Sequence, residues 1–220
     1  MHRLLPATLS CLFPLSALAA DDPTASPSHW PAAATLEVEP CLLPLPQGVG
    51  AEAATLVRIA CNEHRLWQQP VINRAGHLIS SGPSEAERDM LSDDGMRAWQ
   101  RVASYWQGSG TLAAVADRPG ALQCGQPDFP DAAAHCRSFL LDTPWSAAFI
   151  SWVMRQAGIT DFPVSASHIP YVAAAHARPD AGPYRTADPY QSRLRPGDLV
   201  CYLRGREQNL GHAGLMLALA

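Results

Sequence analysis

The chain has 220 residues, a formal net charge of −4, a pI near 6.0 and 47% hydrophobic residues. This length allows one or two domains, and the hydrophobic fraction supports a sizeable core, which excludes a wholly disordered chain. All 16 basic residues are arginines and none of them forms a run. We therefore expect no nucleic-acid partner and no catalytic lysine.

The first 20 residues have the pattern of a secretory signal peptide. A short basic start, His2 and Arg3, precedes an apolar stretch over residues 4–18, and small residues close the segment near Ala19 and Ala20. The stretch is too short and too interrupted by proline to span a membrane, and no later segment has the ~18 uninterrupted apolar residues of a membrane helix. The sequence predicts an exported protein, periplasmic or extracellular, with no membrane span.

Export places the cysteines in an oxidising compartment, where they can form disulfides. Five remain after cleavage, and the simplest local pairs are Cys41 with Cys61 and Cys124 with Cys136, which leaves Cys201 over. Spacing does not determine connectivity, so other pairings stay open. No Cys-x-x-Cys pair is present, and we expect neither a metal site nor a cofactor.

Residues 21–50 are rich in proline and alanine, and we expect an irregular arm or linker there. A single domain is predicted over residues 51–220. Its first half begins with a helix over 51–67, and a second helix over 96–108 ends at a glycine. Residues 117–142 contain proline, glycine and two cysteines, which favours a long loop held by a disulfide.

The second half begins with the segment "TPWSAAFISWVMRQAGI", residues 143–159, which has the apolar spacing of a helix. A further helix is expected from Ile169 to about His176. Two strands close the chain, one in "RPGDLVCYL" (195–203) and one in "GHAGLMLAL" (211–219).

Ser146 is the candidate nucleophile. Thr143 is a plausible N-cap and Pro144 a fitting first helical residue, which would place Ser146 third, in the first turn of the helix. Unpaired backbone N–H groups at a helix start can hold an oxyanion, but a hydroxyl there still needs a base. His212, at the start of the last strand, is the candidate base. The alternative is that Ser146 is only a local partner of the backbone.

Four blocks in order, "PWSAAFISWVMRQAGI", "SASHIPYV", "RPGDLVCYLRG" and "GHAGLML", resemble the bacterial domain of unknown function 2272 family, from about "IACNEHRLW" to the C-terminus. More distantly, the order is similar to the CHAP and NlpC-type peptidases, which are papain-like cell-wall hydrolases. In these relatives a cysteine falls at Ser146 and a histidine at His212. The resemblance implies an α+β, papain-like fold with N-terminal helices on a small antiparallel sheet, and peptidoglycan peptide or another envelope peptide as the partner.

Two departures from the peptidase pattern leave alternatives open. The nucleophile is a serine, which is less acidic than a thiol and needs more help from the base. The strand that orients the histidine in those families is not seen after His212, so the chain is incomplete, the orienting residue comes from elsewhere, or no complete triad exists.

The sequence therefore predicts a peptidoglycan peptide or amide hydrolase with catalytic Ser146 and His212. The residues expected to bind substrate are Trp145, Ser167, His168 and Tyr171. The alternatives are a catalytically inactive module that binds wall peptides or a protein partner, and a structural envelope component whose site is only packing.

Overall fold

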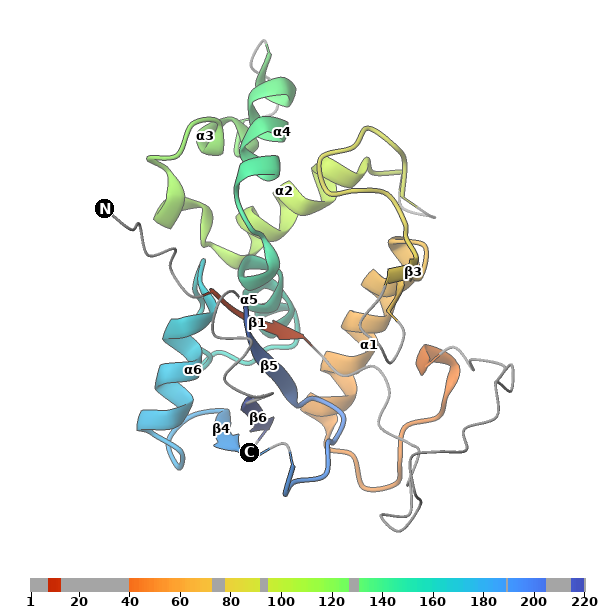
Figure 1. Ribbon diagram of the computed structural model, residues 1–220, viewed down its shortest axis with the longest axis vertical. Helices are drawn as coiled ribbons and strands as arrows, with labels where there is room; N and C mark the ends of the chain where they lie inside the picture. The colour runs from red at the N-terminus through yellow and green to blue at the C-terminus, as the bar shows by residue number, and fades with distance from the viewer. Residues whose placement is uncertain are drawn as a thin grey trace.

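A computed structural model of the chain describes residues 8–12, 40–72, 78–91, 95–126, 131–188, 190–204 and 215–219. Helices surround a small antiparallel sheet, and helix α5 (Ser146–Gln156) runs through the middle of the molecule (Figure 1). The predicted α+β class is confirmed.

The predicted helices form close to where the apolar spacing places them. Helix α1 begins at the expected residue, whereas α2 and α6 begin one or two residues from theirs. None of the helices described is long and apolar enough to cross a membrane. Besides α5, the helices are α1 (Ala51–Leu66), α2 (Ala98–Ser109), α3 (Ala121–Cys124), α4 (Ala132–Asp142) and α6 (His168–Ala177), with 3₁₀ turns η1 (Pro40–Leu42) and η2 (Leu112–Val115).

The prediction of a long loop over 117–142 is wrong, because the segment contains α3 and α4. The glycine and proline of "RPGALQCGQPDFP" mark only the ends of these helices. Ala132, Cys136, Phe139 and Leu140 lie at helical spacing and are buried on one face of α4. Packing of this face against α2 determines the structure of the segment.

The main sheet has the strand order β1-β5-β6-β4, and all neighbours are antiparallel. The expected strands are present as β5 (Leu199–Arg204) and β6 (Leu215–Leu219). Asp198 is buried before β5, and its carboxylate accepts the backbone N–H groups of Arg195, at 2.8 Å, and Leu219, at 3.0 Å. The remaining strands were not predicted: β1 (Thr8–Leu12), β4 (Tyr184–Ala187) and the separate pair β2 (Val71–Ile72) and β3 (Leu78–Ser80).

Strand β1 lies within the segment that has the signal-peptide pattern. In the full chain its backbone pairs with β5, and the Cα of Cys11 stands opposite that of Cys201. Cleavage near Ala20 would remove this strand and leave β5 at the edge of the sheet. Cleavage stays a prediction, because the structure is that of the whole chain.

Both preferred disulfides are confirmed. Cys41 is bonded to Cys61 and ties the segment before α1 to that helix, with Cα atoms 5.5 Å apart. Cys124 is bonded to Cys136 and joins α3 to α4, with Cα atoms 4.7 Å apart. The expectation that Cys201 is left over concerns the cleaved chain; in the whole chain Cys201 is disulfide-bonded as well.

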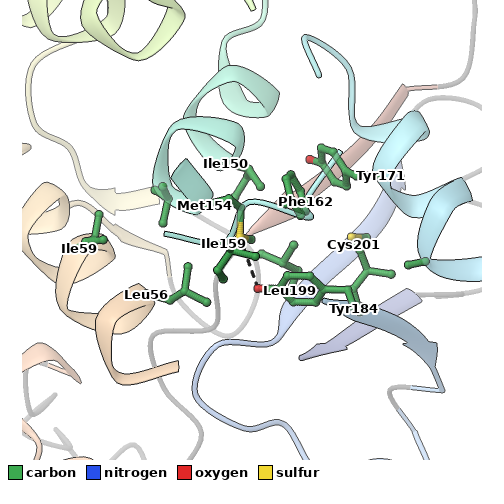
Figure 2. Packing of buried hydrophobic residues seen from close by; sticks show 13 residues of the cluster. Leu56, Ile59, Ile150, Met154, Ile159, Phe162, Tyr171, Tyr184, Leu199 and Cys201 are labelled. Carbon is green, nitrogen blue, oxygen red and sulfur yellow. Dashed lines mark hydrogen bonds between the residues drawn. The ribbon is translucent and has the colours of Figure 1, made fainter. Parts of the chain in front are cut away.

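Helix α5 lies between two hydrophobic clusters. One face packs with α1, α6 and the sheet, and Figure 2 shows Ile150 and Met154 of α5 meeting Phe162, Tyr184 and Leu199 there. The other face, with Ala148, packs against α2, α3 and α4. Because both sides of α5 are covered, the start of this helix is held in a fixed place.

Candidate functional site

Ser146 is the first residue of α5, and its side chain is half-buried. Trp145 precedes the helix, and the first helical backbone hydrogen bond runs from the N–H of Phe149 to the C=O of Trp145 at 2.9 Å. The amides of the first turn therefore lack partners within the helix. The helix start is also the positive end of its dipole, which favours negative charge near the Ser146 hydroxyl.

The expected capping by Thr143 and Pro144 is not what forms. Thr143 follows the last residue of α4 in extended backbone, is buried, and accepts a hydrogen bond from Nη1 of Arg118 at 3.4 Å. Since α4 reaches Asp142, the chain must turn before it can start a new helix. Ser146 thus opens α5 instead of standing third in it.

His168 is the hydrogen-bond partner of Ser146. Its Nε2 lies 2.8 Å from Oγ of Ser146, and the ring is only 6% exposed. His168 is the first residue of α6, so two helix starts meet at this contact. The sequence prediction placed His168 among the substrate-binding residues, and the structure places its Nε2 within hydrogen-bonding reach of the Ser146 hydroxyl.

A buried serine on α5 explains how the chain brings His168 back to Ser146. The Ser151 hydroxyl donates to the C=O of Ser165 at 3.0 Å and accepts the N–H of the same residue at 2.9 Å. Ser151 is fully buried. These two bonds hold the connection between α5 and α6 along α5, so that α6 starts beside Ser146. Sequence reasoning missed this contact, and a serine in an apolar helical face is the signal that could have found it.

Tyr171 completes a chain of three side chains. It stands one turn after His168 on α6, and its hydroxyl is hydrogen-bonded to Nδ1 of His168. The phenol is 1% exposed and packs against Phe162 with ring centroids 4.9 Å apart. Burial raises the pKa of Tyr171 above its ordinary value, so the phenol keeps its proton in neutral solution. Ser146, His168 and Tyr171 thus form a continuous chain of hydrogen-bonded side chains.

The other predicted substrate-binding residues differ in position. Trp145 is half-buried and stacks on Trp67, at 5.8 Å between ring centroids, and on Tyr105, at 5.7 Å. It therefore belongs to the aromatic packing between α1, α2 and α5. Ser167 is exposed immediately before α6, next to His168.

A cavity of about 290 Å³ is lined in part by Tyr171. Phe162 and Tyr184 line it together with Tyr171, and the charged side chains at its wall are Asp161 and Arg178. Tyr171 is thus shared between this cavity and the contact with His168.

A separate polar network joins α1 to α2. Glu63 is 3% exposed and forms an ion pair with Arg101, while the hydroxyl of Tyr105 donates to the same carboxylate. Trp67 donates its indole N–H to the Tyr105 oxygen at 2.8 Å, and the Arg101 guanidinium lies 5.3 Å from the Trp152 ring centroid. Every member of the network has a partner, which is the pattern of a structural contact.

His212, the predicted base, lies outside the described residues. Within the part of the chain that the structure does describe, no group of three or more His, Cys, Asp or Glu side chains could hold a metal ion.

Comparison with known proteins identifies a family. Neither the curated proteins nor the solved structures contain a match to the chain. A family model described as an uncharacterized protein conserved in bacteria (DUF2272) matches residues 93–220, which begin just before α2 and exclude α1. The match is shorter than the resemblance expected from the sequence, but it covers more than half of the chain and includes Ser146, His168 and Tyr171. The chain therefore belongs to the bacterial domain of unknown function 2272 family.

Proposed function

We propose that this chain is an exported hydrolase that cleaves a peptide or amide bond of the cell wall, with Ser146 as its nucleophile and His168 as its base. The observation that carries the proposal is the hydrogen bond of 2.8 Å between Oγ of Ser146 and Nε2 of His168. A serine hydroxyl becomes a useful nucleophile when a base within hydrogen-bonding reach can take its proton.

The reaction follows from this geometry. Oγ of Ser146 attacks the carbonyl carbon of the substrate while its proton passes to Nε2 of His168, and the carbonyl oxygen becomes an oxyanion. The N–H groups at the start of α5 stabilise that charge. The imidazolium then gives the proton to the leaving nitrogen as the C–N bond breaks. A water molecule hydrolyses the acyl-serine in the same way, with His168 again as base.

The substrate class rests on the four ordered motifs, which resemble papain-like cell-wall peptidases, and on the signal-peptide pattern. Two disulfides are compatible with an exported protein. A papain-like arrangement is part of the proposal, with Ser146 at the position of the peptidase cysteine. His212, which the resemblance implies as the base, is the alternative to His168 in the same reaction.

One observation favours the second candidate, an inactive module that binds wall peptides. The partner of His168 Nδ1 is the neutral phenol of Tyr171, whereas the serine-protease triad has a carboxylate there, and replacing that carboxylate by an amide lowers kcat by about 10⁴. With so weak a base, the chain would bind wall peptides without turnover.

The test is release of new amino groups from purified peptidoglycan by the intact protein. Release by the wild type that disappears in Ser146→Ala and in His168→Gln is the expected result. Ser104→Ala, a helical serine bonded only to its own helix, and His176→Gln, an exposed histidine on α6, are the matched controls. Equal release from Ser146→Ala would reject the proposal. Loss in His212→Gln with normal release from His168→Gln would move the role of base to His212.

A further inference from the structure

We infer that Tyr171 is a positioning residue that keeps the proton of neutral His168 on Nε2, so that at rest the imidazole donates to Ser146 instead of accepting from it. The kinetic consequence rests on the proposed function. The position of the proton does not, and it can be measured whether or not the protein is a hydrolase.

The three side chains can be hydrogen-bonded in two ways. In the first, the Tyr171 hydroxyl donates to Nδ1, and Nε2–H donates to Oγ of Ser146. In the second, Nδ1–H donates to the Tyr171 oxygen, and the Ser146 hydroxyl donates to Nε2. Both fit the positions of the heavy atoms, because the contacts join Nε2 to Oγ and Nδ1 to the phenol oxygen in either case. Only the second leaves Nε2 able to accept the proton of Ser146.

The surroundings of Tyr171 favour the first arrangement. Its hydroxyl is hydrogen-bonded to Nδ1 of His168, and the structure gives the phenol no other acceptor among the described residues. The side chain is 1% exposed, so the hydroxyl cannot turn to bulk water. Because burial also keeps the phenol protonated, a proton that is not donated to Nδ1 is a buried donor without a partner, and such groups are strongly disfavoured.

Unlike Tyr171, Ser146 is not fully enclosed by the protein. Ser146 is the least buried of the three residues, so solvent is the partner that we assign to its hydroxyl proton when Nε2–H donates to the oxygen. The first arrangement therefore leaves all three groups with a partner, whereas the second leaves the Tyr171 proton without one. The two arrangements differ by one buried donor without a partner. The free-energy cost of such a donor corresponds to a roughly tenfold higher population of the tautomer that carries the proton on Nε2.

The consequence for catalysis is that Tyr171 restrains the nucleophile. Only the minor tautomer of His168 can deprotonate Ser146. Tyr171→Phe keeps the ring that packs on Phe162 and removes the hydroxyl, and the two tautomers then come to comparable populations. We expect kcat for hydrolysis to rise by up to about tenfold, with KM unchanged.

The direct experiment is ¹⁵N NMR of the full chain with labelled histidine, at a pH where the imidazole is neutral. The chain has eight histidines, and His168→Gln identifies the signals of His168. In the wild type Nε2 carries the proton and Nδ1 does not, and in Tyr171→Phe both nitrogens show mixed character. Tyr184→Phe is the matched control, because it removes another buried hydroxyl of the same cluster, which donates to the C=O of Gly197 at 2.8 Å. Its His168 signals should equal those of the wild type.

Two results would overturn the inference: a wild-type His168 protonated on Nδ1, or signals in Tyr171→Phe that match the wild type. If the wild-type tautomer is as inferred but Ser146→Ala releases as many amines as the wild type, the proposed function fails and the role of Tyr171 stands.

Discussion

Replacement of Ser151 by alanine tests how the site is assembled. This hydroxyl is fully buried in α5 and makes two hydrogen bonds to the backbone of Ser165. Each such bond contributes about 0.5–1.5 kcal/mol net, so Ser151→Ala should lower the free energy of unfolding by about 1–3 kcal/mol. Ser165 is only partly buried, and water can replace part of the loss, so the lower half of this range is expected.

Urea unfolding followed by tryptophan fluorescence measures the stability change. In a chain of this size each kcal/mol lowers Tm by about 2–4 °C. The substitution also frees the connection that carries His168 to Ser146, so the NMR signals of His168 should shift in Ser151→Ala. Ser104→Ala, which removes a hydroxyl bonded only within α2, is the control for both measurements. Equal stability and unchanged His168 signals in Ser151→Ala and Ser104→Ala would refute the role that we give to Ser151.

Further outcomes follow from the remaining contacts. Arg101→Met leaves the carboxylate of Glu63 buried without its cation and should cost about 3–5 kcal/mol in urea unfolding; a loss below 1 kcal/mol would show that the pair is solvated. Removal of residues 1–20 leaves five cysteines, an odd number that cannot all pair within one chain. Thiol titration of the unfolded, exported monomer should therefore find at least one free thiol. A protein with no free thiol and with the mass of all 220 residues would disprove cleavage. The stability that several buried tyrosines contribute should be constant below about pH 10 and be lost above it, because burial raises their pKa in the folded state and only the unfolded chain then releases those protons. Each such group contributes about 1.4 kcal/mol per pH unit, and a flat profile to pH 11 would contradict the burial of Tyr105, Tyr171 and Tyr184.

Local patterns were sufficient for much of the fold. The helix over 51–67 and the helix at Ser146 follow from apolar residues at helical spacing, and the two short-range disulfides follow from cysteines close in the chain. Local patterns failed at α4, where glycine and proline nearby concealed a helix whose buried face is defined by packing. They also failed at β1 and β4, since a strand of four or five residues depends on partners far away in sequence.

The position of Ser146 could be predicted from the sequence, whereas its hydrogen-bond partner could not. Ser146 stands at a helix start, as the motif indicated, although it opens the helix. His168 and Tyr171 were expected near the substrate, and the structure instead joins them to Ser146 through hydrogen bonds. The contact between Glu63 and Arg101 was not anticipated, because these two residues lie on different helices and are 38 residues apart in sequence.

The sequence alone determined that this chain carries a serine at the start of a buried helix, within motifs of one bacterial family, because helix spacing and motif order are local properties. Only the tertiary structure decided which group meets that serine. His168 is 22 residues away, and it reaches Ser146 because the two hydrogen bonds of Ser151 hold the connection against α5. Such a contact depends on the packing of whole helices, and no spacing rule encodes it.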